Sequence, residues 1–218
     1  MPRPTTLTKA RVPLTRDRIV DATLHIMDTE GLDAVSMRRV AREVGVEAMS
    51  LYNHVRDKDD LLNGVIERVM GGFAFPDRDQ HDDWVVYGRR LAYAWRDVLR
   101  AHPTVMQLFA ERKHGTSLDT LRPMEAALEV LRGAGLGERE AVQAFHTIGG
   151  FIFGYVMMES GYLPGGQQNA QMFPPVPPDE LPNVAACLPY LADCDFDGEF
   201  AFGLDLMLEG LRAKIGAG

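Results

Sequence analysis

Residues 36–54 read SMRRVAREVGVEAMSLYNH and hold two short helical patterns joined at a glycine. Ser36 is a typical N-cap for a helix that ends at Gly45, and a second short helix is expected from about Glu47 to His54. Gly45 stands where the chain must turn sharply, and glycine adopts a positive φ angle at little steric cost. Two short helices around such a turn are typical of a helix-turn-helix.

The two short helices have an inner and an outer side. Val40, Ala41, Val46 and Leu51 are spaced to pack against a preceding helix. The outer side carries short hydroxyl, amide and cationic groups, which suit phosphate oxygens and the edges of bases. Its residues are Arg38, Ala48, Met49, Ser50, Tyr52, Asn53 and His54.

Helical patterns continue on both sides of this stretch. Before it, an amphipathic pattern follows the expected N-cap Thr15 and stops at Gly31; after it, Asp57 is expected to cap a longer helix that ends at Gly71. Beyond Pro76, helical patterns occur at residues 84–101, 104–113, 118–132, 138–161 and 196–215, and residues 164–182 form a long loop rich in Pro, Gln and Gly. No run alternates convincingly at period two, so the predicted fold class is all-α.

Charge is unevenly distributed along the chain. The net charge is −8, but Met1 to Lys58 hold ten Lys and Arg against eight Asp and Glu. The acidic excess therefore lies outside the N-terminal quarter, which permits DNA binding there. We expect a flexible basic arm over residues 1–13, a helix-turn-helix domain over 14–72 and a larger domain over 77–218.

Residues 14–70 resemble the DNA-binding domain of the tetracycline-repressor (TetR) family of transcriptional regulators. The matching elements, in order, are Ile19 with Ala22, Gly31, residues 36–41 (SMRRVA), 44–46 (VGV), 51–55 (LYNHV), Lys58 and Leu61-Leu62. Residues 141–159 resemble more loosely the central core helix of the tetracycline repressors themselves, through Gly149, Gly150, Phe151 and Gly154.

The resemblance implies that the helix near residues 47–54 is a recognition helix, which lies in the major groove of DNA. It implies contacts with backbone phosphates for Ser36, Ser50, Tyr52, His54 and Lys58. The residues implied to face bases are Arg38, Ala48, Met49 and Asn53, of which Arg38 suits guanine and Asn53 suits adenine.

The resemblance also implies that the larger domain is a helical bundle that binds a small-molecule effector and forms a homodimer. The dimer helices would be residues 138–161 and 196–215.

For the effector pocket we predict an aromatic and Met-rich set, which favours an apolar or aromatic ligand: Leu91, Trp95, Met106, Phe109, Phe145, His146, Phe153 and Met157. His146 is the polar candidate, because its neighbours in the sequence are apolar. Met158 and Leu91 stand where the tetracycline repressors have an acidic residue for magnesium coordination and an amide, so we expect a different effector and no metal.

These features predict a repressor that binds a palindromic operator as a homodimer and is released when the effector binds. The helix from Asp57 to Met70 would transmit the change. An activator with the same DNA domain is the alternative, because the operator's position relative to the promoter decides the sign. A helical small-molecule-binding protein without DNA function would have no reason for the motif at residues 51–58.

The sequence offers little for other classes of protein. No stretch approaches the roughly 18 apolar residues of a membrane span, and the first residues lack the apolar core of a secretory signal. Cys187 and Cys194 form neither a disulfide framework nor a zinc spacing, so we expect a reducing cytoplasm. The six histidines show no metal-binding pair, and no catalytic motif such as Gly-x-Ser-x-Gly occurs. We therefore expect no enzymatic activity, no metal and no cofactor.

Overall fold

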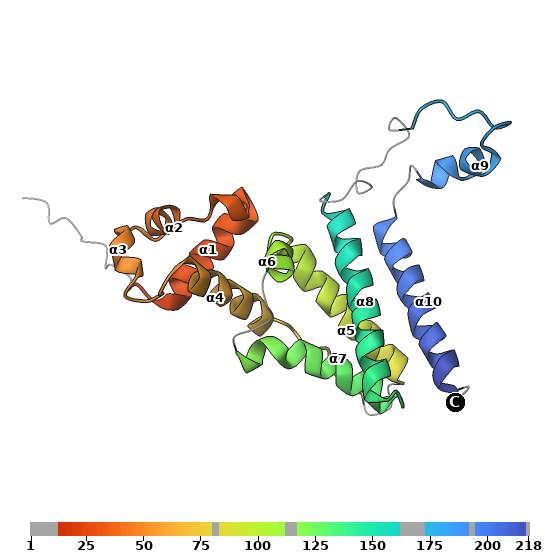
Figure 1. The fold of residues 1–218 in the computed structure, drawn as a ribbon, viewed down its shortest axis with the longest axis horizontal. Coiled ribbons are helices and arrows are strands. Elements are labelled where there is room, and N and C mark those ends of the chain that lie inside the picture. The colour runs from red at the N-terminus through yellow and green to blue at the C-terminus, as the bar shows by residue number, and fades with distance from the viewer. Residues whose placement is uncertain (1–12, 80–82, 112–116, 162–172, 192–194, 217–218) are drawn as a thin grey trace, which may run out of the picture. The chain divides into compact units, whose positions relative to one another are not determined.

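The structure is a computed structural model that describes residues 13–79, 83–111, 117–161, 173–191 and 195–216. All regular elements within these ranges are helices, which confirms the predicted all-α class (Figure 1). The contacts divide the chain into an N-terminal unit, Met1–Arg68, and a C-terminal unit, Val69–Gly218. The predicted arm at residues 1–13 and the first part of the predicted loop at 164–182 lie outside the described residues, apart from Pro13.

The N-terminal unit is built from short helices whose ends follow from the local sequence. Thr15 and Ser36 are N-caps as predicted, since their hydroxyl oxygens accept the backbone N–H groups of Arg18 and Arg39. Gly45 has φ 75° and ψ 36°, the left-handed conformation that the sharp turn requires. The elements are α1 (Arg16–Glu30), the 3-10 turn η1 (Leu32–Ala34), α2 (Met37–Val44), α3 (Ala48–Leu51) and most of α4 (Lys58–Gly71).

The third helix is shorter than the sequence predicts. A helix was expected over residues 47–54, but α3 ends at Leu51 and a turn follows. The N–H groups of His54 and Val55 both donate to the carbonyl of Leu51, at 2.9 and 3.0 Å, which holds that turn close to the helix. The side chains of Leu51 and Val55 are buried, so the helix and the turn are fixed to the same core.

The C-terminal unit is a bundle of longer helices in which α5 packs against α7, α8 and α10 (Figure 1). Phe200, Leu204 and Leu208 of α10 are buried against α5 and α8. At Gly203, an added Cβ would lie 2.6 Å from the ring of Phe151, so the glycine lets α10 approach α8 closely. The elements are α5 (Trp84–Ala101), α6 (Val105–Glu111), the 3-10 turn η2 (Leu118–Leu121), α7 (Arg122–Gly133), α8 (Glu138–Glu159), α9 (Pro182–Leu191) and α10 (Phe196–Gly216).

Two elements of this unit differ from the sequence-based prediction. Residues 118–132 are not one helix, because η2 gives way to α7 at Arg122, and Pro123 lies in the first turn of α7 where its missing N–H is not needed. The prediction contains no helix between residues 182 and 196, whereas α9 occupies most of that stretch and includes Pro189. Pro182 begins this helix and Pro189 lies inside it, and proline is uncommon inside helices, so the sequence of this segment gives a weak helical signal.

Helix α8 is the one helix in the described ranges whose length and hydropathy would suffice to cross a membrane. Ala141, Ala144, Ile152 and Val156 on this helix are buried within the bundle. Its last residue, Glu159, forms an ion pair with a buried arginine of α5. One side of α8 is therefore packed against the other helices of the bundle.

Candidate DNA interface and regulatory site

The helix-turn-helix presents α3 on a small rigid core. Of the residues predicted to pack inward, Val40, Ala41 and Leu51 are buried and Val46 is half-buried, so one side of α2 and α3 packs inward as expected. The left-handed Gly45 ends α2, and the N–H of the next residue, Val46, donates to the carbonyl of Ala41 at 2.9 Å. The outer side of α3 is therefore held in one orientation by backbone geometry as well as by packing.

The structure places the residues predicted to contact DNA at the surface of this unit. Met49 on α3 is 74% exposed, and Tyr52, directly after α3, is 46% exposed. Apolar side chains that lie together among polar ones can form part of a binding surface. Ser36, Arg38, Met49, Tyr52, Asn53, His54 and Lys58 are exposed, and Ala48 and Ser50 are half-buried.

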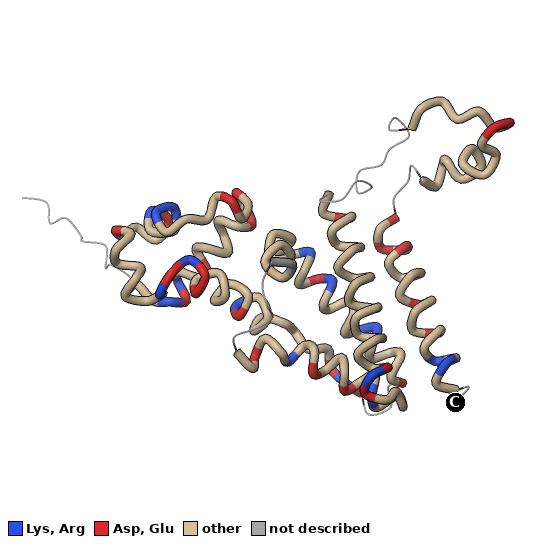
Figure 2. Tube along the Cα trace, in the orientation of Figure 1, with Lys and Arg blue, Asp and Glu red and all other residues tan. Residues whose placement is uncertain are grey.

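Arg39 belongs to the fold rather than to the candidate DNA-contacting set. Its guanidinium is 2.5 Å from a carboxylate oxygen of Glu30 on α1 and 2.7 Å from one of Glu43. The hydrogen bonds to Glu30 and Glu43 raise the pKa of Arg39. The bond between Arg39 and Glu30 also lowers the pKa of Glu30. Figure 2 shows basic residues on the short helix α2. Arg39 is ion-paired, whereas Arg38 on the same helix has no ion pair within the described residues.

An ion pair between α1 and α4 fixes the loop that follows α3. Asp60 accepts two hydrogen bonds from the guanidinium of Arg16, at 3.1 and 3.2 Å, and one from the backbone N–H of Arg56 at 2.9 Å. The bond from Arg56 and then the pairing with Arg16 lower the pKa of Asp60. Asp57 caps α4 as predicted, because its carboxylate accepts the N–H of Asp60 at 2.7 Å. The partners Arg16 and Asp60 were missed by the sequence analysis, since nothing local connects them.

Six of the eight residues predicted to line an effector pocket lie in two adjoining apolar clusters of the C-terminal unit. Trp95 contacts both clusters, and its ring centroid is 6.2 Å from that of Phe109 and 5.9 Å from that of Phe73. Leu91 belongs to the cluster with Phe73. The six are Leu91, Trp95, Met106, Phe109, Phe153 and Met157.

The other two predicted pocket residues do not join this group. Phe145 packs instead on a separate cluster around Leu131 and Ala144, and the side chain of His146 is exposed. His146, the predicted polar residue of the pocket, therefore lies at the surface of this unit and not within these clusters. Helical periodicity does put His146 on the same face as Phe153, but seven residues separate them by about 10 Å along the axis.

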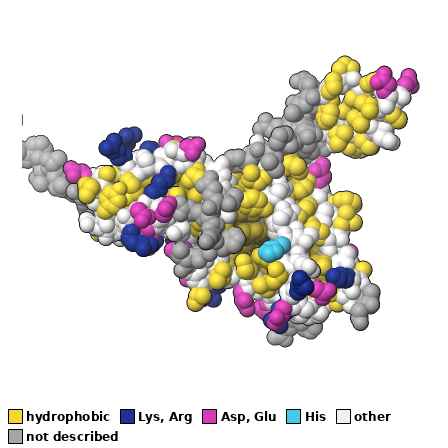
Figure 3. Space-filling model, in the orientation of Figure 1, with side chains coloured by type: hydrophobic (Ala, Val, Ile, Leu, Met, Phe, Trp, Pro, Cys, Tyr) yellow, Lys and Arg dark blue, Asp and Glu magenta, His cyan; other side chains and the backbone are white. Residues whose placement is uncertain are grey.

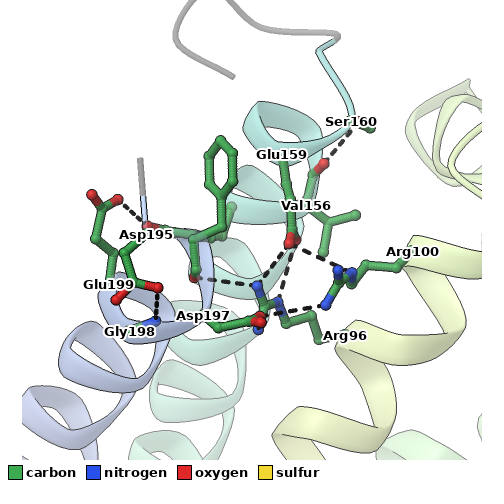
Figure 4. Close-up of polar contacts among 11 residues, drawn as sticks. Arg96, Arg100, Val156, Glu159, Ser160, Asp195, Asp197, Gly198 and Glu199 are labelled. Carbon is green, nitrogen blue, oxygen red and sulfur yellow. Dashed lines mark hydrogen bonds and ion pairs between the residues drawn. The ribbon is translucent and has the colours of Figure 1, made fainter. Parts of the chain in front are cut away.

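A buried ion-pair cluster connects α5, α8 and α10 (Figure 4). The side chain of Arg96 is 2% exposed and lies 2.8 Å from Glu159 and 2.8 Å from Asp197. It also donates to the carbonyl of Phe196 at 3.2 Å and lies over the ring of Phe200, 4.3 Å from its centroid. The sequence analysis missed this cluster. The signal in the sequence was that Arg96 lies on the apolar face of the helical pattern of α5.

The outer face of α8 and α10 carries apolar groups that none of the described residues covers. Val142 on α8 and Phe202 and Leu206 on α10 are between 42% and 68% exposed. A Cβ added at Gly149, Gly150 or Gly154 would meet nothing within 4 Å. A groove of about 280 Å³ runs between the helices and is lined by Leu136, Glu140, Gln143, Ala144, Thr147, Ile148, Leu206, Met207, Gly210, Leu211 and Lys214. Figure 3 shows further apolar side chains over α9, which has no buried residue.

No metal site is visible in the part of the chain that the structure describes: nowhere do three His, Cys, Asp or Glu side chains gather closely enough to hold an ion. Cys187 on α9 is exposed, and Cys194 lies outside the described residues.

Comparisons with known proteins agree with both units. The model of the family described as "Bacterial regulatory proteins, tetR family" matches residues 19–65, and that of "Tetracyclin repressor-like, C-terminal domain" matches residues 75–215. The HTH-type transcriptional repressor DrrR1 of Streptomyces coeruleorubidus is 32% identical over 215 residues, which cover 93% of this chain and 78% of DrrR1. Crystal structures of ActR from Streptomyces coelicolor, without ligand and in complex with actinorhodin, have a TM-score of 0.79 and 29% identity. They cover 94% of this chain and 98% and 100% of ActR.

Proposed function

Because the chain belongs to the TetR family of helix-turn-helix transcriptional regulators, we propose that it is a repressor that binds a palindromic operator as a homodimer. A small molecule that binds the C-terminal unit would release it from the DNA. The observation that carries this proposal is the exposed outer side of α3, where Met49 and Tyr52 project from a rigid helix-turn-helix. As for other intracellular DNA-binding regulators, its proposed location is the cytoplasm.

For the DNA complex, the recognition helix α3 enters the major groove, and its flanking residues contact the backbone. The proposed phosphate contacts are Ser36, Ser50, Tyr52, His54 and Lys58, and the proposed base contacts are Arg38, Ala48, Met49 and Asn53. Exposure of seven of these nine side chains supports the assignment. Arg38 can donate two hydrogen bonds to a guanine, Asn53 can pair with an adenine, and Met49 can contact a thymine methyl group.

We place the dimer interface on the outer face of α8 and α10. Among the described residues, nothing lies within 4 Å of a Cβ added at Gly149, Gly150 or Gly154, so close packing within the subunit does not explain these glycines. Exposed Phe202 and Leu206 supply apolar area to bury against a second copy. A two-fold interface of this kind uses the same patch on both subunits and therefore places the two α3 helices symmetrically on a palindrome.

The proposed effector is an apolar or aromatic small molecule that binds near Leu91, Trp95, Met106, Phe109, Phe153 and Met157. The aromatic and thioether character of this group supports that ligand class, as does the complex of the related ActR with actinorhodin. No metal or cofactor is part of this proposal, and enzymatic activity is not part of it either.

The coupling would run through α4, which continues from Lys58 to Gly71 across the boundary between the two units. An effector shifts the equilibrium only by as much as it prefers the form that does not fit the operator. Coupling of this kind is typically about 1–3 kcal/mol, which corresponds to roughly 5–150-fold in operator affinity.

The test is a genomic DNA-binding selection with the purified full chain, at two salt concentrations, with Tyr52→Ala and Asn53→Ala as variants. The proposal predicts enrichment of one palindromic site. Tyr52→Ala should weaken binding to any DNA, and Asn53→Ala should relax the preference at one base position in each half-site. Salt-sensitive binding without sequence preference, or no binding, would refute the proposal.

A further inference from the structure

Arg56 lies in the loop between the candidate recognition helix and α4, and its side chain is 83% exposed. Its neighbours His54 and Lys58 are also exposed, whereas Val55 between them is buried. Buried Val55 fixes the path of the loop and leaves the flanking side chains in solvent. The loop therefore presents three groups that can donate to an anion, of which two are proposed phosphate contacts already.

The backbone of Arg56 is held in place independently of its side chain. Its N–H donates to a carboxylate oxygen of Asp60 at 2.9 Å, and Asp57 accepts the N–H of Asp60 at 2.7 Å. These two bonds close the loop onto the first turn of α4. The direction in which the Arg56 side chain leaves the backbone is thus set by the fold.

The guanidinium of Arg56 is only weakly engaged within the chain. Its Nε lies 3.8 Å from Asp60, a distance too long for a hydrogen bond. Asp60 already accepts two hydrogen bonds from Arg16, so most of its charge is compensated from the other side. A pair of this length contributes little, because water solvates the exposed guanidinium of Arg56. Release of Arg56 to an external anion therefore costs little.

Two other arginines of this unit differ from Arg56, because they form short ion pairs. Arg39 is held between Glu30 and Glu43 at 2.5 and 2.7 Å, and Arg68 pairs with Asp21 at 2.8 Å. The first turn of α4 also offers little to a phosphate, because Asp57 accepts one of its N–H groups and Asp59 adds negative charge there. An anion at this edge must therefore be met by side-chain cations.

We propose that Arg56 is a further DNA-contacting residue, which binds a backbone phosphate next to the one contacted by Lys58. Asp60, with its charge balanced by Arg16, is the positioning residue for this contact. The inference rests on the proposed function and deepens it. It assigns the contact to the phosphate backbone and not to a base, so it adds affinity without sequence preference.

The experiment measures the operator affinity of the full-length protein by fluorescence anisotropy between 50 and 200 mM salt, for the parent and for Arg56→Gln. Each phosphate contact contributes about −0.9 to the slope of log K against log salt, and a homodimer has two copies of Arg56. The slope should become less steep by about 1.8. Across this fourfold range of salt, the parent should lose about twelvefold more affinity than the variant. A scrambled duplex should show the same change, because no base is read.

Arg68→Gln is the matched control. It removes the same charge from an exposed arginine of the same unit, which lies on α4 and is paired with Asp21. Arg56→Lys should retain most of the slope, since it keeps the charge. Equal changes in Arg56→Gln and Arg68→Gln would show a net-charge effect and overturn the inference. An unchanged slope in Arg56→Gln would overturn it as well. If the parent itself selects no operator, the proposed function fails and the contact with it, and that result is distinguishable because it is seen without any substitution.

Discussion

Replacement of Arg96 by methionine tests whether the buried ion-pair cluster holds α5, α8 and α10 together. The guanidinium is the shared partner of Glu159, Asp197 and the carbonyl of Phe196. Removal of one partner of a buried ion pair typically costs about 3–5 kcal/mol, because the remaining charge is left in a poorly solvated site. The side chain of Glu159 is 10% exposed, so that penalty applies to it.

Two features place the expected loss at the lower end of that range. Asp197 is 75% exposed, and its pair with Arg96 contributes little on its own. Arg100 also remains 3.5 Å from Glu159 and compensates part of its charge. We therefore expect Arg96→Met to lower the free energy of unfolding by about 3 kcal/mol.

Urea unfolding at a fixed protomer concentration measures this loss, since dimerisation would make stability depend on concentration. The control is Arg89→Met, which breaks the half-exposed pair between Arg89 of α5 and Asp205 of α10 and should cost no more than about 1 kcal/mol. The double variant Arg96→Met/Glu159→Leu should regain most of the stability, because no charge is left unpaired. Equal losses in Arg96→Met and Arg89→Met, or a double variant less stable than Arg96→Met, would refute the reasoning.

Four further substitutions have outcomes that the structure sets. Gly45→Ala should lower the free energy of unfolding by about 1–2 kcal/mol, because an L side chain is strained at φ 75° although the space around Gly45 is open. Thermal unfolding measures this loss, and Gly45→Asn is the control that should lose less. Gly203→Ala should cost about 1–3 kcal/mol, since its Cβ would overlap the ring of Phe151. Gly149→Ala should instead leave the subunit intact but weaken self-association in sedimentation experiments, and an unchanged dimer would contradict the proposed interface. Asp60 has a lowered pKa in the folded state, so its ionised form contributes stability that is present above the unfolded-state value near ~3.9 and lost as the pH falls through the folded-state value. The stability difference between the parent and Asp60→Asn should therefore be large at pH 7 and shrink below about pH 4 in urea unfolding, and a constant difference would contradict it.

The sequence was sufficient for features that depend on local chemistry. The caps Thr15, Ser36 and Asp57 and the left-handed Gly45 each follow from a residue and its neighbours within four positions. The inward packing of α2 and α3 likewise follows from helical periodicity. Features that depend on distant partners could not be predicted, because the pairing of Arg16 with Asp60 joins positions 44 residues apart.

The candidate effector site shows the same limit in a different way. Periodicity assigns a residue to a face of its helix, and this placed Trp95, Phe109 and Phe153 near one another correctly. Periodicity does not show at which point along the helix axis that face packs against the neighbouring helices. His146 shares a face with Phe153 but lies about two turns away, beside the ring of Phe145, and is exposed.

Net charge is a poor guide to where this chain would meet DNA, because pairing decides which charges are available. In the N-terminal unit, carboxylates already compensate Arg16, Arg39 and Arg68. Within the part of the chain that the structure describes, Arg38 and Lys58 have no ion pair, and Arg56 has only a long one. The available cations therefore lie on α2 and on the loop after α3, on either side of the recognition helix in the sequence. A unit with almost balanced charge can thus present a positive binding edge, while its acidic residues stabilise the scaffold that holds that edge in place.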